Sequence, residues 1–451
     1  MIIVDRPGLR PLEAAADLYP ITRHPTDDSI VALRAGRPIT RASFLRDVAA
    51  LAARLPDHRY IVNLCNDRYR FMVGFAASLC RGQVSLLPPG DAPGVLQAVA
   101  ADYPDLYALT DSAAAPPLPR LDYPETLEGG AAVLPAISGT QPALILFTSG
   151  STGRPAPVPK SWGVLVRSAL AAGDRLAISR ATIIATVPHQ HSYGLESTIL
   201  LAWQHGLAVK AGGLFFPADI RAAIEAAPQP RILVTTPVHL KALVADPGGM
   251  PPVDLILSAT APLPIALAAH AETCFSARLI EIYGCTEAGQ VATRRTVRDA
   301  AWHCLDGVVL NRRNGRVWAS GPAVEGEALL QDEIEPAGPA SFHLGGRSAD
   351  LVDVAGKRTS LAHLNHLLLG IEGVQDGVFF MPEPAGRTVA RLAALVVAPT
   401  LRPDDIRTAL RALTDAAFLP RPLVLVGALP RNALGKLPRE ALLKLLRRGG
   451  V

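Results

Sequence analysis

The part of the chain that decides the fold is residues 144–155, which read Leu144-Ile145-Leu146-Phe147-Thr148-Ser149-Gly150-Ser151-Thr152-Gly153-Arg154-Pro155. An apolar strand runs directly into a loop of hydroxyl residues and glycines. Glycines let backbone N–H groups approach an anion closely, and the hydroxyl groups add donors, so such a loop can wrap a polyphosphate. It is not a Walker P-loop, because no Gly-Lys-Ser/Thr follows at the required spacing. An isolated loop of this composition would equally well be a solvated turn.

Short β-like runs alternate with helix-like segments on both sides of this loop. The runs that predict strands are residues 60–64, 143–147, 182–187, 231–235, 254–257 and 279–283. Helical spacing or Ala-rich composition marks residues 71–80, 163–172, 195–203, 237–245 and 265–275. This alternation favours an α/β fold with largely parallel sheets. The strands are apolar nearly throughout, as expected when helices cover both faces of a sheet.

The composition and the pattern of predicted elements change twice in the second half of the sequence. Residues 307–326 are Gly/Arg-rich with shorter strands, which predicts a small β unit. A second alternation begins after Gly346 and ends in a basic amphipathic helix at residues 439–447. We therefore expect a large N-terminal domain of stacked, mostly parallel sheets with helices at residues 1–349. Residues 350–451 are expected to form a small mobile α+β domain.

Composition excludes several classes of protein. The chain has 451 residues, 49% of them hydrophobic, with 44 Lys and Arg against 40 Asp and Glu. A nearly balanced charge and only 5% aromatic residues argue against a nucleic-acid partner. Five scattered cysteines argue against a disulfide framework and against a Cys-rich zinc site. The sequence has no signal-peptide pattern and no window of about 18 apolar residues, so we expect a cytoplasmic protein without membrane insertion.

The loop is the first of several motifs that together resemble the adenylate-forming superfamily, which includes acyl- and aryl-CoA synthetases, peptide-synthetase adenylation domains and luciferase. The later motifs, in family order, are Pro188-His189-Gln190-His191-Ser192-Tyr193-Gly194, Ser258-Ala259-Thr260-Ala261-Pro262-Leu263, Tyr283-Gly284-Cys285-Thr286-Glu287, Asp332 ahead of Gly346-Arg347, and Pro430-Arg431-Asn432-Ala433-Leu434-Gly435-Lys436. The resemblance covers residues 145–439. It implies an ATP-dependent, AMP-forming ligase that activates a carboxylic acid as its acyl-adenylate and passes the acyl group to a thiol.

The resemblance also implies site residues, with ATP and Mg²⁺ as cofactors. The expected nucleotide contacts are Thr148, Ser149, Gly150, Ser151, Thr152, Gly153, Lys160, Thr260, Ala261, Tyr283, Gly284, Asp332 and Arg347. The expected catalytic residues are Lys436, Glu287, Thr286 and His191, with Glu287 also a magnesium ligand, since Mg²⁺ prefers one or two carboxylates plus phosphate oxygens. The acid pocket is expected to be lined by His191, Tyr193, Gly284 and Ala288.

These roles suit the chemistry. The reaction sets a carboxylate against the α-phosphate of ATP, so catalysis means holding two anions in line and neutralising charge. Gly435 allows a sharp turn that presents the ammonium of Lys436 to the developing charge. Asp350 falls at the family's hinge, where a small C-terminal domain rotates between two half-reactions. In the second orientation the segment around Gly356-Lys357-Arg358 is expected to line the path of the thiol.

The chain departs from the family at several positions. Ala156 stands where the family has a phosphate-loop lysine, so we expect either that Lys160 reaches the γ-phosphate or that backbone donors suffice. Ala259-Thr260 replaces the usual Gly-Gly beside the adenine, which predicts a tighter wall. Leu330-Gln331-Asp332 departs from the family's Thr-Gly-Asp. His189 is the alternative to His191 if the register of the strand differs.

A narrower resemblance concerns the acid. The pattern around Lys160 and Trp162, with residues 286–295, resembles short ligases of aryl-polyene and xanthomonadin pigment synthesis, which charge a hydroxybenzoate onto an acyl carrier protein. This implies 3- or 4-hydroxybenzoate as substrate and an acyl carrier protein as partner. An acyl- or aryl-CoA synthetase, with CoA as acceptor, is the main alternative. A non-catalytic nucleotide-binding homologue is the alternative from another class.

Overall fold

The computed structural model describes residues 17–88, 90–113, 116–130, 133–148, 156–214, 216–347, 351–354, 357–382, 391–414, 416–432 and 437–449. The chain divides into two compact units, Met1–Leu329 and Leu330–Val451. This division falls earlier than the boundary expected at residues 349/350, because the hairpin at 332–347 contacts the helix and the strand that follow it. Asp350 lies outside the described residues, so its role as the hinge stays a prediction.

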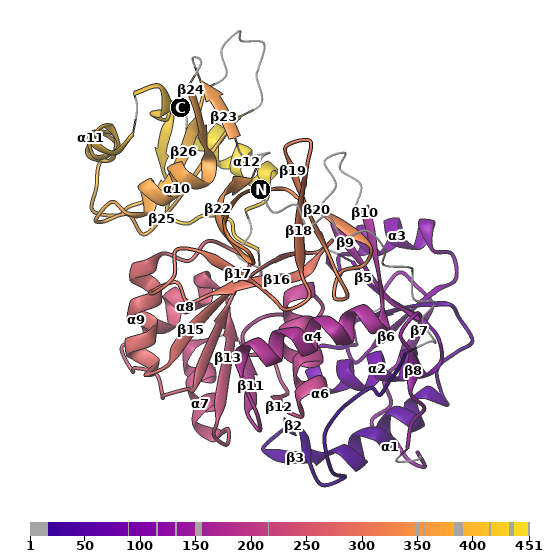
Figure 1. Ribbon diagram of the computed structural model, residues 1–451. Coiled ribbons are helices and arrows are strands. Elements are labelled where there is room, and N and C mark those ends of the chain that lie inside the picture. Colours follow the sequence, from indigo (N-terminus) through magenta and orange to yellow (C-terminus); the bar gives the residue numbers. More distant parts are fainter. Residues whose placement is uncertain are drawn as a thin grey trace. The chain divides into compact units, whose positions relative to one another are not determined.

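The first large sheet of the N-terminal unit has the strand order β10-β9-β5-β4-β6-β7 (Figure 1). Its strands are β10 (Ala156–Ser161), β9 (Pro142–Thr148), β5 (Val84–Leu87), β4 (Tyr60–Asn63), β6 (Leu106–Thr110) and β7 (Arg120–Asp122). All neighbouring pairs are parallel except β9 and β10, which form an antiparallel hairpin. The phosphate-loop sequence therefore connects two hydrogen-bonded neighbours of this sheet.

The second large sheet carries the other motifs of the N-terminal unit. Within this unit its order is β17 (Trp302–Cys304), β16 (Gly289–Arg294), β15 (Arg278–Cys285), β14 (Leu255–Ser258), β13 (Arg231–Thr235), β11 (Thr182–Ala185), β12 (Ala208–Lys210), β2 (Ile30–Arg34) and β3 (Arg37–Thr40). The strands from β15 to β2 are parallel, and β16, β17 and β3 are antiparallel additions at the two sides. A short pair, β1 (Leu18–Tyr19) and β8 (Ile137–Ser138), stands apart from both sheets.

Helices cover both faces of each large sheet. One apolar core joins the two sheets through α1 (Arg41–Ala52), α2 (Arg68–Cys80), α4 (Trp162–Leu176) and α6 (Leu201–His205). On the far face of the second sheet lie α7 (Pro217–Ala226), α8 (Pro237–Val244) and α9 (Ile265–Phe275). Helix α3 (Pro93–Asp102) packs on the outer face of the first sheet. The predicted α/β fold with stacked, mostly parallel sheets is confirmed, and strands buried on both faces explain why their sequences are apolar throughout.

Local sequence signals set the ends of several helices. Asp67 caps α2 by accepting a hydrogen bond from the backbone N–H of Arg70, and Thr236 caps α8 in the same way through His239. The expected helix at residues 195–203 is present in two parts, a π-helical turn at Leu195–Leu200 followed by α6. The small β unit is also present as β18 (Val309–Arg313), β19 (Arg316–Ser320) and β20 (Glu327–Leu330).

The C-terminal unit has α+β organisation. It begins with two hairpins, β21 (Asp332–Gly338) with β22 (Ser341–Arg347) and β23 (Leu351–Val354) with β24 (Lys357–Ser360). A three-stranded sheet of β25 (Asp376–Phe380), β26 (Ala393–Val397) and β27 (Leu423–Leu425) packs with α10 (Leu361–Leu369), α11 (Pro403–Leu413) and α12 (Arg439–Gly449) around its own apolar core. Over the described ranges of both units, no helix has the length and apolar character that a membrane span requires.

Candidate active site

The turn between β15 and β16 contains the Tyr-Gly-Cys-Thr-Glu motif. Residues 286–288 form a three-residue turn that ends at Gly289, whose φ is +76°. A three-residue hairpin loop closed by a left-handed glycine is a common hairpin geometry. Gly284 is required by close approach, because an added Cβ would lie 2.2 Å from the carbonyl oxygen of Gly289. The backbone therefore holds Thr286 and Glu287 at the carboxyl end of β15, at the tip of the hairpin.

Lys160 lies beneath this turn. Its side chain is only 2% exposed, and Nζ donates a 2.5 Å hydrogen bond to the main-chain carbonyl oxygen of Glu287. Burial lowers the pKa of the ammonium, and the nearby carboxylates of Glu196, Glu325 and Glu287 act in the opposite direction. The hairpin register of β9 and β10 places Lys160 opposite Leu144, on the edge strand of the first sheet. Contact of Lys160 with the γ-phosphate, expected from the sequence, stays a prediction.

Glu196 is a buried acid that the sequence analysis missed. It lies on the π-helical turn, is 5% exposed, and accepts a 2.5 Å hydrogen bond at Oε1 from the hydroxyl of Ser192. Burial raises the pKa of the carboxyl, against the opposing effects of Ser192, Lys160 and the backbone N–H of Gln290. A glutamate inside a helical segment that was expected to be buried was a usable signal, because an acidic residue is rarely buried without a specific reason.

Two histidines precede this helix, and they occupy different environments. His189 is 5% exposed, and its ring lies 3.0 Å from the carbonyl oxygen of Cys65 through Nε2. Burial, assisted by the positive charge of Arg68, lowers the pKa of His189 to about 3. His191 is half-buried and stands at the amino end of the short helix α5 (Ser192–Gly194). The structure therefore places His191, rather than the alternative His189, where a side chain is accessible.

Tyr193 links the helix to the carboxyl ends of two parallel strands. Its hydroxyl lies 3.1 Å from the carbonyl oxygens of both Thr235 in β13 and Leu257 in β14. Burial raises the pKa of this phenol far above its ordinary value, so it remains a neutral donor. Tyr193 is thus brought close to the start of the segment that contains Thr260 and Ala261.

Thr260 has an unusual backbone conformation. It is exposed and has a φ of +79°, in the region that favours glycine. A β-branched residue rarely adopts a positive φ. The replacement of glycine by Thr260, noted in the sequence, thus leaves the backbone in a glycine-type conformation that now carries a side chain.

The remaining predicted site residues fall in three groups. Ser149, Gly150, Ser151, Thr152, Gly153, Asp350, Gly356 and Lys436 lie outside the described residues. The backbone of Thr148 is described and pairs with Ala156 across the β9–β10 hairpin. In the C-terminal unit, Asp332 and Arg347 are opposite each other in the register of the β21–β22 hairpin. Opposed residues in such a ladder have Cα atoms about 4.5–5.5 Å apart, so the two predicted ribose contacts are neighbours.

The N-terminal unit therefore brings together two of the predicted site residues, Lys160 and Glu287. The carboxylate of Glu287 is half-buried at the tip of its turn. The usual ligands of Mg²⁺ are one or two carboxylates together with phosphate oxygens, and the single carboxylate of Glu287 fits that pattern. In the part of the chain that the structure describes, no three acidic, His or Cys residues gather as a metal site of their own.

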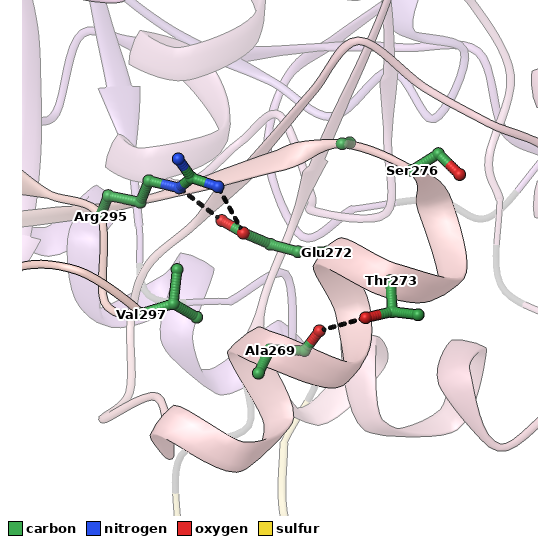
Figure 2. Close-up of a pocket in the computed structure, with 7 residues that line it drawn as sticks. Ala269, Glu272, Thr273, Ser276, Arg295 and Val297 are labelled. Atoms are coloured by element: carbon green, nitrogen blue, oxygen red, sulfur yellow. Dashed lines mark hydrogen bonds and ion pairs between the residues drawn. The ribbon is translucent and has the colours of Figure 1, made fainter.

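An open hollow elsewhere in this unit is not the candidate site. It is lined by residues of α9, of the turn that follows α9 and of the segment after β16, including Glu272, Ser276 and Arg295 (Figure 2). Arg295 donates to both oxygens of Glu272, at 2.9 and 2.6 Å. The hollow lies at the Arg278 end of β15, whereas the Thr286–Glu287 turn follows the Cys285 end.

Comparisons with known proteins agree with this arrangement. The profile of the AMP-binding enzyme family matches residues 50–314. A 4-coumarate–CoA ligase of Rhodobacter capsulatus is 32% identical over 234 residues, 51% of this chain and 58% of the relative. A 3,4-dihydroxybenzoate–[aryl-carrier protein] ligase of Bacillus anthracis is 23% identical over 251 residues, 53% of this chain and 59% of the relative. The chain thus spans less than two thirds of the length of these two relatives.

Solved structures match over nearly the whole chain. ATP-bound MatB of Rhodopseudomonas palustris superimposes with a TM-score of 0.80 at 19% identity, covering 94% of this chain and 97% of that chain. The o-succinylbenzoate coenzyme A synthetase MenE of Bacillus subtilis, in complex with AMP, has a TM-score of 0.80 at 18% identity, covering 92% and 95%. At these identities the likeness establishes the fold. With the family profile and the ordered motifs, it follows that this chain belongs to the AMP-binding enzyme family, within the adenylate-forming superfamily.

Proposed function

We propose that this protein is an ATP-dependent ligase that converts a carboxylic acid, of the hydroxybenzoate type, into its acyl-adenylate and transfers the acyl group to the thiol of an acyl carrier protein. The observation that carries the proposal is the hairpin turn with Glu287 at its tip and Lys160 hydrogen-bonded to it from below. In the proposed reaction this turn would contact the nucleotide on one side and the acid on the other. The family membership supplies the reaction class.

The residues would share the work as follows. The glycine and hydroxyl donors of residues 148–153 would hold the phosphates of ATP, and Asp332 with Arg347 would hold its ribose. Glu287 would hold Mg²⁺, which when bound supplies neutralising charge at the phosphates. The ammonium of Lys436 would stabilise negative charge as the acid attacks and pyrophosphate leaves, a contribution that acts mainly in the transition state. MenE has been solved with ATP and a magnesium ion, which supports both cofactors for this chain.

Rotation of the C-terminal domain about Asp350 would serve the second half-reaction. Lys436 would withdraw after adenylation, and the segment around Lys357 and Arg358 would approach the adenylate. The thiol ionises without much help from a general base, so His191 is proposed as a gate or wall of the acid chamber.

Relatives support an aromatic acid. Those named above act, by name, on 4-coumarate and 3,4-dihydroxybenzoate, and a further relative of Aromatoleum aromaticum is an indoleacetate–CoA ligase. These relatives differ in their thiol acceptor, because some are CoA ligases and one uses an aryl-carrier protein. CoA as acceptor is therefore the second candidate. A cytoplasmic location is part of the proposal.

The test is pyrophosphate release with ATP and Mg²⁺ over a panel of aromatic and aliphatic acids, followed by transfer to carrier protein or to CoA. We expect hydroxybenzoates to support release and the carrier protein to be acylated. Faster transfer to CoA would show that CoA, rather than a carrier protein, is the acceptor, and the assignment as an acid–thiol ligase would stand. No release with any acid, from a folded protein that binds ATP, would favour the non-catalytic homologue.

A further inference from the structure

A buried polar cluster lies directly under the Thr286–Ala288 turn, and the proposed mechanism gives it no role. Its members come from four parts of the fold. They are Lys160 of β10, Ser168 of α4, Ser192 and Glu196 around the π-helical turn, and Gln290 of β16. Four of them, all except Ser192, are between 2 and 5% exposed.

The cluster contains oxygen atoms that no described residue satisfies. Oε2 of Glu196, Oγ of Ser168 and Oε1 of Gln290 are buried and have no hydrogen-bond partner among the residues of the described ranges. Nearly all buried polar atoms in folded proteins have a partner, so three such atoms in one cluster need an explanation. The hydrogen bonds Ser192 to Oε1 of Glu196 and Gln290 Nε2 to Ser197 do not involve these three oxygens. The backbone N–H of Gln290 is near enough to favour the carboxylate form of Glu196, but it makes no well-formed hydrogen bond to Oε2.

Two of these oxygens face a common point. A Cβ placed on Gly289 would lie 3.4 Å from Oε2 of Glu196 and 3.8 Å from Oγ of Ser168. Gly289 has no side chain, and its φ of +76° favours glycine. Gly289 thus places no side chain against the two oxygens, and both atoms are buried.

The position next to Gly289, which the two oxygens face, is close along the chain to the residues expected to line the acid pocket. Ser192, which binds Glu196, stands between His191 and Tyr193, two of the expected walls of the acid pocket. Gly289 follows Ala288, a third expected wall. The unsatisfied oxygens of Glu196 and Gln290 thus belong to the two segments, the helix after His191 and the hairpin after Tyr283, that contain the expected walls of the pocket.

We propose that Glu196 is a specificity-determining residue: its free Oε2, with the hydroxyl of Ser168 beside it, accepts a hydrogen bond from a hydroxyl or amino group on the ring of the acid. The inference rests on the proposed ligase function and identifies the ring hydroxyl or amino group as the part of the substrate that Glu196 recognises. Substrates are then aromatic acids that carry a hydrogen-bond donor away from the carboxyl group.

Lys160 has a supporting part in this arrangement. Its ammonium is already bound to the carbonyl oxygen of Glu287. It acts on Glu196 at longer range, as a nearby positive charge that favours the carboxylate form. Glu196 thereby keeps two acceptor oxygens, one for Ser192 and one for the substrate.

The experiment measures kcat/KM for pyrophosphate release with 3- and 4-hydroxybenzoate, 3- and 4-aminobenzoate, benzoate, 4-methoxybenzoate and octanoate. 4-Methoxybenzoate has an oxygen atom at the same ring position as 4-hydroxybenzoate but cannot donate a hydrogen bond from it. The variants are Glu196→Gln and Ser168→Ala, with Glu281→Gln as the matched control. Glu281 is another buried glutamate, 4% exposed, whose partners are Arg294 and Thr296. Thermal unfolding of each variant is recorded beside the kinetics.

The wild-type protein is expected to prefer donor-bearing acids over benzoate and methoxybenzoate. Glutamine has one acceptor oxygen, which Ser192 already uses, so Glu196→Gln should reduce that preference about 10- to 100-fold. Ser168→Ala removes a hydroxyl that has no hydrogen-bond partner among the described residues, so it should fold normally and reduce the preference about 2- to 10-fold. Glu281→Gln should lower the melting temperature and leave the preference unchanged.

Two results would overturn the inference while leaving the ligase in place. One is a wild-type preference for benzoate, methoxybenzoate or octanoate. The other is that Ser168→Ala and a folded Glu196→Gln leave the ratio between acids as it is in the wild type. If Glu196→Gln does not fold, Ser168→Ala alone decides the outcome. The absence of pyrophosphate release by the wild-type protein with every acid would instead reject the proposed function, and this inference with it.

Discussion

The ammonium of Lys160 donates a 2.5 Å hydrogen bond to the main-chain carbonyl oxygen of Glu287, 127 residues further along the chain. The bond joins β10, the strand that follows the phosphate loop, to the turn that presents the predicted magnesium ligand. A charged donor held by a backbone acceptor in a buried setting fixes the position of that turn.

The first prediction separates two roles for Lys160. Lys160→Met removes the donor and leaves the carbonyl of Glu287 buried, which should lower the free energy of unfolding by about 1.5–3 kcal/mol. Chemical denaturation measures this loss, and exposed Lys241→Met is the control. An unchanged stability combined with a raised KM for ATP would instead support direct contact of Lys160 with the γ-phosphate.

A second prediction concerns Gly284. In Gly284→Ala the new methyl group would lie 2.2 Å from the carbonyl oxygen of Gly289, so the hairpin must open. We expect a loss of about 1–3 kcal/mol in stability and a large loss of pyrophosphate release. Gly213→Ala is the control, because an added Cβ there meets no atom within 4 Å. Equal behaviour of the two variants would show that the close approach is tolerated.

The sequence predicted the framework of the fold well for a physical reason. Strands such as β11, β13 and β14 are buried on both faces, so their apolar runs stand out against the polar segments between them. The β9–β10 hairpin did not stand out, because β10 contains Pro157, Pro159 and the buried Lys160. Proline and lysine are both depleted in strands, and only the tertiary setting explains Lys160.

The candidate site could be predicted where motifs contain glycine. Gly284 and Gly289 mark a turn whose geometry requires them, and the turn is present. Partners that come from distant segments could not be predicted. Lys160 with Glu287 and Glu196 with the neighbourhood of Gly289 depend on how two sheets pack, and spacing along the chain contains no record of that packing.

A third prediction tests the strain at Thr260. A left-handed conformation costs a residue with a Cβ roughly 1–2 kcal/mol, and glycine avoids this cost. Thr260→Gly should therefore be more stable than Thr260→Ala by about 1 kcal/mol, because alanine keeps the Cβ. Thermal unfolding of the pair measures the difference. Equal melting temperatures would mean that the φ of +79° is not strained in this loop.

A fourth prediction concerns acid stability. Burial lowers the pKa of His24 to about 4, and that of His189 to about 3. The unfolded chain, with histidine pKa values near 6.5, binds more protons than the folded chain below that pH. Stability from these groups is thus complete above about pH 6.5 and falls as the pH decreases, by up to about 1.4 kcal/mol per pH unit for each histidine.

The measurement is urea unfolding at pH 7, 6 and 5 for the wild type and His24→Gln. Glu196 and Glu281, whose pKa values burial raises, act in the opposite direction, so the difference between the two proteins isolates the histidine. The variant should be less stable at pH 7 and should lose less stability on acidification. Parallel curves would contradict a neutral buried His24.

The final prediction concerns Lys436, which the sequence alone identifies. Its ammonium is expected to act on charge that develops as the carboxylate attacks the α-phosphate, so it contributes to the transition state more than to binding of ATP. Lys436→Ala should reduce pyrophosphate release by at least about 10²–10³-fold, with the melting temperature and ATP affinity close to wild type. Lys444→Ala removes an exposed lysine of α12 and should leave the rate unchanged. A chemically prepared acyl-adenylate separates the half-reactions: Lys436→Ala should still transfer its acyl group to the thiol, because the lysine is needed only to form the adenylate. Loss of both half-reactions, or near-wild-type pyrophosphate release by Lys436→Ala, would reject this assignment.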